Sequence, residues 1–126
     1  MTEQAYQKKI IKAIKADGGH AFTGSFPKGE ADIVAGVKTL WYNRDRGMME
    51  AKLLFAQIEV KTEHDYHRVM NSLVELDGVL EIHNRKGLKD HEPLQIAKIN
   101  KIRSLGGLGL FAFEYKQVKE YINDNK

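Results

Sequence analysis

Glu59 and Lys61 are two charged residues, separated by a single position, at the end of a run that is otherwise apolar. The run from Leu53 to Val60 has the composition of a strand, and the period of two in a strand puts Glu59 and Lys61 on the same face. Such a run predicts a central strand, where a charged pair needs partners or a metal ion. The alternative is a cross-strand ion pair at a solvated edge, the usual role of an isolated E-x-K pattern.

Asp32 is a second carboxylate embedded in a β-rich run, at residues 31–35. If this strand pairs with the one that carries Glu59, the two carboxylates meet near the strand ends. Two carboxylates are enough for one Mg²⁺, for which Mn²⁺ is expected to substitute, and the backbone carbonyl of Val60 offers a neutral ligand. The chain has no cysteine, which excludes thiolate metal sites and disulfides.

Two carboxylates and a lysine are the groups that phosphodiester hydrolysis needs. A metal ion polarises the phosphate and lowers the pKa of an attacking water, and a further group positions that water. Asp32 and Glu59 would hold the ion, and Lys61 would lie beside the water. Burial would lower the pKa of Lys61 and the neighbouring carboxylates would raise it, so we expect an orienting role rather than that of a base.

The elements that must position these residues alternate between helices and strands. Residues 3–16 carry apolar side chains at helical spacing and end at a glycine pair, which predicts an amphipathic helix. After Pro93, isoleucines recur every third residue before Gly106, which predicts a second helix. The other expected elements are strands at 20–22, at 31–35 ending at Gly36, at 37–42, at 53–60 and at 108–115, a turn at 43–47, and a helix at 116–122.

This order predicts an α/β domain with a mixed sheet flanked by helices. A chain of 126 residues is long enough for one such domain with a single core. Residues 62–93 are the least defined, because 66–76 fit a helix while 78–82 fit a short strand before a turn at 84–87.

The residues around Asp32 and Glu59 resemble the core of a known nuclease superfamily. The run from Gly29 to Gly36 (GEADIVAG), followed by Ile58 to Lys61 (IEVK), is similar to the PD-(D/E)XK motif, with Ala31 in place of the motif's proline. The similarity is in particular to VRR-Nuc nucleases of phages and DNA repair enzymes, and to archaeal-type Holliday-junction resolvases. It implies a restriction-endonuclease-like core, a Mg²⁺-dependent DNA endonuclease activity, and a homodimer that makes paired cuts in a two-fold symmetric junction.

The resemblance also implies roles outside the motif. Glu3 matches a glutamate that often faces the metal site from the first helix, and Gln95 matches the glutamine that begins the helix after the E-x-K strand. Ser25 resembles the loop serine of the archaeal resolvases. Residues 62–93 are longer than the minimal family core, which indicates an insertion within a single nuclease domain of residues 1–126.

The charge balance permits a nucleic-acid partner without requiring one, because 20 Lys and Arg stand against 17 Asp and Glu, a net charge of +3. Several basic residues on the helices and in the hairpin turn are candidates for phosphate contacts, and the alternative for each is a solvated surface. They are Lys8, Lys12, Lys98, Lys101, Arg44 and Arg46. No base-reading motif is present, so we expect recognition of DNA shape and backbone.

No apolar run is long enough to cross a bilayer, and we expect a soluble cytoplasmic protein, of cellular or phage origin, with no membrane partner. Three other functions stay open beside a structure-specific endonuclease. The first is a less selective or restriction-type DNA nuclease, and the second is a non-catalytic DNA-binding module of the same fold. The third is an α/β interaction protein without a nucleic-acid role, whose binding would show no salt dependence.

Overall fold

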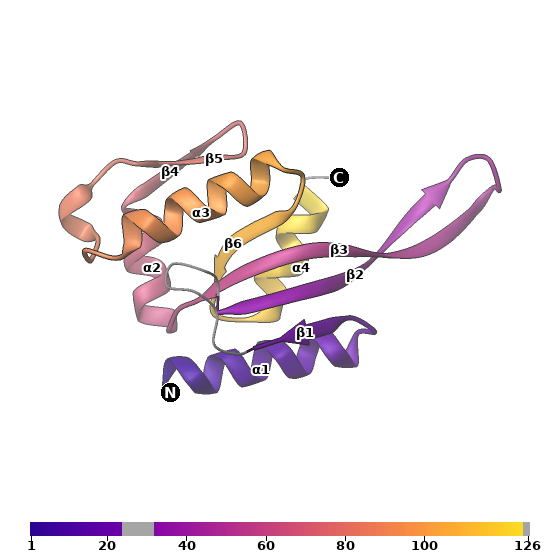
Figure 1. The fold of residues 1–126 in the computed structure, drawn as a ribbon, viewed down its shortest axis with the longest axis horizontal. Helices are drawn as coiled ribbons and strands as arrows, with labels where there is room; N and C mark the ends of the chain where they lie inside the picture. The colour runs from indigo at the N-terminus through magenta and orange to yellow at the C-terminus, as the bar shows by residue number, and fades with distance from the viewer. Residues whose placement is uncertain (24–31, 125–126) are drawn as a thin grey trace.

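The computed structural model describes residues 1–23 and 32–124, and a mixed sheet in the order β1-β2-β3-β6 lies at its centre (Figure 1). β1 pairs with β2 and β2 with β3 in antiparallel fashion, whereas β6 runs parallel to β3. The strands are β1 (His20–Phe22), β2 (Ile33–Asn43), β3 (Met48–Val60) and β6 (Leu108–Ala112). The expected α/β class with a mixed, helix-flanked sheet is therefore confirmed.

Helices cover both faces of the sheet (Figure 1). α1 (Glu3–Ala16) and α4 (Tyr115–Asp124) pack on one face, where alternate residues of β2 and β3 join them in a core. α3 (Glu92–Ser104) and α2 (Glu63–Asn71) contribute to a second core on the other face, with Phe111 of β6. In residues 1–23 and 32–124, no helix is both long enough and apolar enough to span a bilayer.

Three expected strand boundaries are wrong. The strand expected to begin at Leu53 begins at Met48, which pairs with Asn43 of β2. The strand that begins at Ile33 does not end at Gly36 but continues to Asn43, because β3 pairs with it without interruption from Ile33↔Ile58 to Asn43↔Met48. The strand expected to reach Tyr115 ends at Ala112. There the Oε1 atom of Gln117 accepts the backbone N–H of Phe113 at 2.7 Å, which turns the chain into α4.

Residues 62–93 build part of the second core. α2 is followed by a hairpin of β4 (Leu73–Leu76) and β5 (Val79–Ile82), then by the short 3₁₀ helix η1 (Arg85–Gly87). The helix expected over 66–76 was wrong after Asn71. The turn at Asp77 and Gly78, both at positive φ, lets the chain fold back, and Asn100 of α3 exchanges two 2.9 Å hydrogen bonds with the backbone of Leu80.

Candidate functional site

The register between β2 and β3 brings Asp32 to Glu59. Ile33 pairs with Ile58, so continuing the antiparallel register by one residue sets Asp32 opposite Glu59. The Oδ2 atom of Asp32 accepts the backbone N–H of Val60 at 2.9 Å, and its carbonyl accepts the Nε2–H of Gln7 at 3.3 Å. Asp32 is therefore held at the strand end, beside the peptide of Val60 and the carboxylate of Glu59.

Glu59 and Lys61 leave the face of β3 that lies under α3, while the side chain of Val60 enters the core on the α1 and α4 side. Both charged residues are buried, with 4% and 5% of their surface exposed. α3 supplies their partners from two positions one helical turn apart, because Gln95 contacts Glu59 and Glu92 contacts Lys61. The charged pair is thus buried rather than solvated, and the edge ion pair considered from the sequence is excluded.

The carboxyl group of Glu59 resists ionisation. Burial and then the neighbouring charge of Asp32 raise its pKa to about 8, although Lys61 acts in the opposite direction. A cation bound nearby would stabilise the ionised form of such a carboxyl group. Two adjoining acids at a strand end, one buried and one half-buried, are the arrangement expected of a hard-cation site.

Gln95 orients one oxygen of Glu59 and leaves an oxygen of its own unused. Its Nε2–H donates to Oε2 of Glu59 at 3.3 Å, whereas its Oε1 is buried and accepts no hydrogen bond from the part of the chain that the structure describes. Buried polar atoms in folded proteins are nearly always paired. This orphaned oxygen therefore fits a site that acquires a water molecule or a hydrated cation.

Lys61 does not stand free beside Glu59. Its Nζ donates to Oε2 of Glu92 at 3.0 Å, its backbone N–H donates to the carbonyl of Ala112 at 3.0 Å, and its Nζ lies 5.8 Å from the centre of the Phe111 ring. Its charge still lowers the pKa of Glu59 and of Glu3. The ammonium group is therefore held in one place from which it acts on the two acids.

Glu92 was missed by sequence reasoning, although it is the anchor of Lys61. It is fully buried, and it accepts hydrogen bonds from Nη1 and Nη2 of Arg68 at 2.8 and 2.9 Å and from the backbone N–H of Lys89 at 2.6 Å. Burial works to raise the pKa of Glu92, but these bonds and Lys61 outweigh it and hold the pKa at about 2. The available signal was its spacing of three from Gln95, which puts both on one helix face.

Glu3 stands in the first turn of α1, whose start is fixed by Thr2, since the Oγ1 atom of Thr2 accepts the backbone N–H of Ala5. Burial raises the pKa of Glu3, as does the charge of Asp32, while Lys61 and Lys89 lower it. Glu3 is therefore within electrostatic reach of the predicted site. Lys89 acts on it from the loop before α3.

The predicted basic residues do not form one track. Lys8 and Lys12 are exposed on α1, whereas Lys98 and Lys101 lie on α3, across the sheet from α1 (Figure 1). Arg44 and Arg46 stand in the turn between β2 and β3, at the far end of the hairpin from Asp32, and Arg46 pairs with Glu50 at 3.3 Å. Ser25 lies outside the described residues.

The donor set fits Mg²⁺. In residues 1–23 and 32–124, no cluster of three or more His, Cys, Asp or Glu side chains is placed to bind a metal ion. Mg²⁺ uses one or two protein carboxylates and keeps its waters, so Asp32 and Glu59, with the free amide oxygen of Gln95 beside them, meet that lower requirement. Val60 contacts Asp32 through its backbone N–H, whereas its carbonyl belongs to the next peptide, whose N–H, that of Lys61, donates to the carbonyl of Ala112.

Comparisons with known proteins add no relative: the sequence matches no family model, and neither a curated protein nor a solved structure matches it significantly.

Proposed function

We propose that the chain is a Mg²⁺-dependent, structure-specific DNA endonuclease with a restriction-endonuclease-like core, related in activity to Holliday-junction resolvases and acting as a homodimer. The observation that carries the proposal is the group formed by the buried Glu59 and Lys61 with the half-buried Asp32 and Gln95, where the ends of β2 and β3 meet α3. An acid pair, a fixed ammonium group and an open amide oxygen together suit the hydrolysis of a phosphodiester better than they suit a structural ion pair.

Each residue has a distinct part in this proposal. Asp32 and Glu59 hold the cation, which when bound lowers the pKa of an attacking water and offsets charge on the phosphate. Gln95 fixes one oxygen of Glu59 by its amide nitrogen, so that the carboxylate keeps its orientation. Lys61, anchored by Glu92, keeps its ammonium group on the face of β3 where the phosphate would lie and orients the water.

The test is cleavage of a panel of four-way, flap, nicked and linear DNAs in Mg²⁺ by wild type, by Asp32→Asn and by Asp77→Asn as a matched control. Asp77 is exposed in the β4–β5 turn at a φ of 51°, which asparagine tolerates. We expect wild type and Asp77→Asn to cut the four-way junction and Asp32→Asn to be inactive. If none of the three proteins cleaves any of these substrates, the proposed endonuclease activity is wrong.

The same panel separates the competing functions. Equal rates on branched and linear DNA would show a less selective nuclease. Tight junction binding that needs no Mg²⁺ and gives no product would show a binding module. If no salt-dependent DNA binding is detected, nucleic acid is excluded as the partner.

A further inference from the structure

The segment between β5 and α3 carries a group of cations beside the site. Residues 83–91, which we call the basic loop, hold Arg85, Lys86 and Lys89 against a single acid, Asp90. All four of these side chains are exposed. The basic loop includes η1 and lies next to α2 and to the start of α3 (Figure 1).

The basic loop is attached to the carboxylate that holds Lys61. The backbone N–H of Lys89 donates to Oε1 of Glu92 at 2.6 Å, and Oε2 of Glu92 accepts a hydrogen bond from Nζ of Lys61 at 3.0 Å. Arg68 makes a second link, because its Nη1 donates to Oε1 of Glu92 and to the carbonyl of Gly87, each at 2.8 Å. One buried carboxylate therefore fixes the ammonium group of the site and the backbone of the basic loop together.

The backbone of the basic loop is held at further points. The N–H groups of His83 and Asn84 both donate to the carbonyl of Ser72, at 2.9 and 3.1 Å. Leu88 is buried in the second core. Gly87 lies so close to Ser72 that a Cβ atom on it would come within 2.1 Å of the Ser72 Oγ. Because this backbone is already ordered, its cations bind a ligand with less loss of conformational entropy than those of a flexible loop.

The charge of Lys89 acts on acids that border the site. Burial and then Asp32 raise the pKa of Glu3, and Lys61 and Lys89 lower it. Burial also works to raise the pKa of Asp65, but Lys89 makes the largest contribution that lowers it. Lys89 is therefore close enough to influence the same acid, Glu3, that Asp32 and Lys61 of the site influence.

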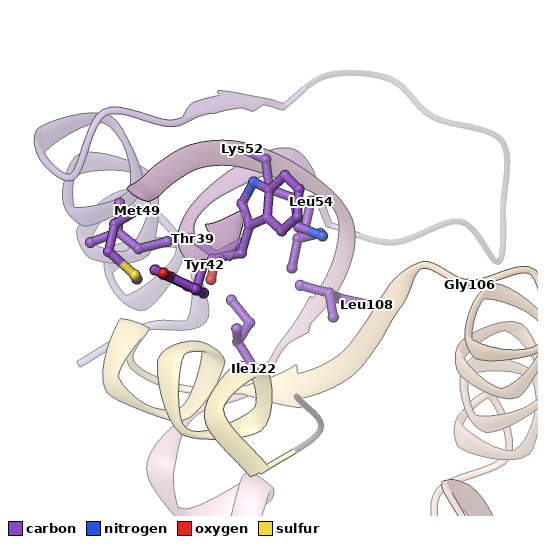
Figure 2. A pocket seen from close by; sticks show the side chains of 10 residues that line it. Thr39, Tyr42, Met49, Lys52, Leu54, Gly106, Leu108 and Ile122 are labelled. Carbon is purple, nitrogen blue, oxygen red and sulfur yellow. The ribbon is translucent and has the colours of Figure 1, made fainter. Parts of the chain in front are cut away.

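A pocket of about 540 Å³ lies elsewhere, at the base of the β2–β3 hairpin (Figure 2). Among the described residues that line it, Lys52 is the one charged side chain, and Trp41, Leu54 and Ile122 are among the others. The Nζ atom of Lys52 lies 5.5 Å from the centre of the Trp41 ring. A phosphate backbone repeats its charge and is held by several cations. This pocket does not meet that requirement, whereas the basic loop does.

We propose that the basic loop is the surface that binds the DNA backbone beside the phosphate to be cut, with Lys86 and Lys89 as its main contacts. The inference rests on the proposed function, because its partner is the DNA that this site would cleave. Contacts to phosphates position the DNA without reading its bases. Asp90 opposes the binding, and its Oδ1 lies 3.8 Å from Nη2 of Arg85. Residues 62–93 then supply a DNA surface as well as the anchor of Lys61.

The test is the binding of a labelled four-way junction, measured by fluorescence anisotropy in Ca²⁺ over a salt series. The double variant Lys86→Ala with Lys89→Ala removes two charges from the basic loop and none of the backbone contacts that hold it. Lys8→Ala with Lys12→Ala is the matched control, because it removes two exposed lysines from α1. The slope of log affinity against log salt is expected to fall by about 2 in the loop variant and to stay unchanged in the control.

Asp90→Asn is a second variant, and a damaged fold would not produce its expected effect. It should bind the junction more tightly than wild type, because it removes the acid beside Arg85. An unchanged slope in the loop variant, an equal fall in the α1 control, or an Asp90→Asn protein that binds no more tightly than wild type would each overturn the inference.

Cleavage in Mg²⁺ by the same proteins separates this inference from the proposed function. Binding that depends on the basic loop, without cleavage of any DNA, would remove the proposed function and leave the DNA surface standing. Cleavage by wild type together with an unchanged slope in the loop variant would remove the DNA surface alone. Absence of DNA binding by wild type would overturn both.

Discussion

The two ends of β3 reverse the usual distribution of side chains. At the body end Glu59 and Lys61 are almost fully buried, whereas Leu53 and Phe55, on the same face of the strand, are more than half exposed. α3 lies over the first pair and not over the second. Charged groups in the interior and apolar groups outside are both costly arrangements, and each indicates a function. The buried acids at the body end are the basis of the proposed cation site, whereas the outer part of the hairpin leaves apolar side chains exposed.

The largest effect on activity is expected for a substitution of Glu59. Glu59→Gln should lower the rate of junction cleavage by about 10³-fold or more, because an amide is a poor ligand for Mg²⁺. The free energy of unfolding should not fall, since burial and Asp32 already oppose the charge of Glu59. Single-turnover cleavage and urea unfolding of the metal-free protein measure the two quantities. A variant that loses stability and activity together would show a structural role.

Ion pairs at the two ends should differ in their contribution to stability. Glu92→Ala leaves Lys61 and Arg68 without their buried partner and should cost about 3–5 kcal/mol. Glu50→Ala removes the exposed pair with Arg46 and should cost less than about 1 kcal/mol. Urea unfolding of both variants at neutral pH compares them. Equal losses of unfolding free energy would mean that the buried ion pairs of Glu92 stabilise the fold no more than the exposed pair of Glu50.

Acid should weaken the same buried network. The folded pKa of Glu92 is lowered to about 2 from an ordinary value of 4.5, so its contribution to stability is present above pH 4.5 and is lost as the pH falls toward 2. The difference in unfolding free energy between wild type and Glu92→Gln should therefore narrow across that range. Urea midpoints at pH 7, at the upper end and near the lower end of this range give the measurement. A constant difference would contradict the low pKa.

The smallest expected effect is on the salt dependence of DNA binding, which distinguishes the α3 side of the sheet from the α1 side. Lys89 acts on Glu3 at the site, whereas Lys12 is exposed on α1, across the sheet from α3. Lys89→Ala should reduce the slope of log affinity for junction DNA against log salt by about 1, and Lys12→Ala should leave it unchanged. Fluorescence anisotropy in Ca²⁺ over a salt series measures both slopes. The opposite result would place the DNA on the α1 face.

Local patterns were enough for several elements of the fold. The helix of residues 3–16 has the expected bounds, because its lysines and isoleucines follow one helical period and a glycine pair ends it. A turn was expected at residues 43–47, and it is found at 44–47, because Asn43 still pairs with Met48 in the β2–β3 ladder. Residues 62–93 were not resolved by pattern alone. The β4–β5 hairpin there depends on Asn100, twenty residues beyond Leu80, and no local signal reports that contact.

The sequence by itself determined that Glu59 and Lys61 share a face, since alternation along a strand is a local property. The β-rich run around Asp32 indicated the second carboxylate, whereas Gln95 was indicated only by the resemblance. Only the tertiary structure decided that α3 lies over that pair and not over Leu53 and Phe55. It also decided that Glu92, at the start of a helix where an acid is usually solvated, is buried between Lys61 and Arg68. Burial depends on which distant segments pack together, and for this reason the same residue types gave a closed site at one end of β3 and an open stripe at the other.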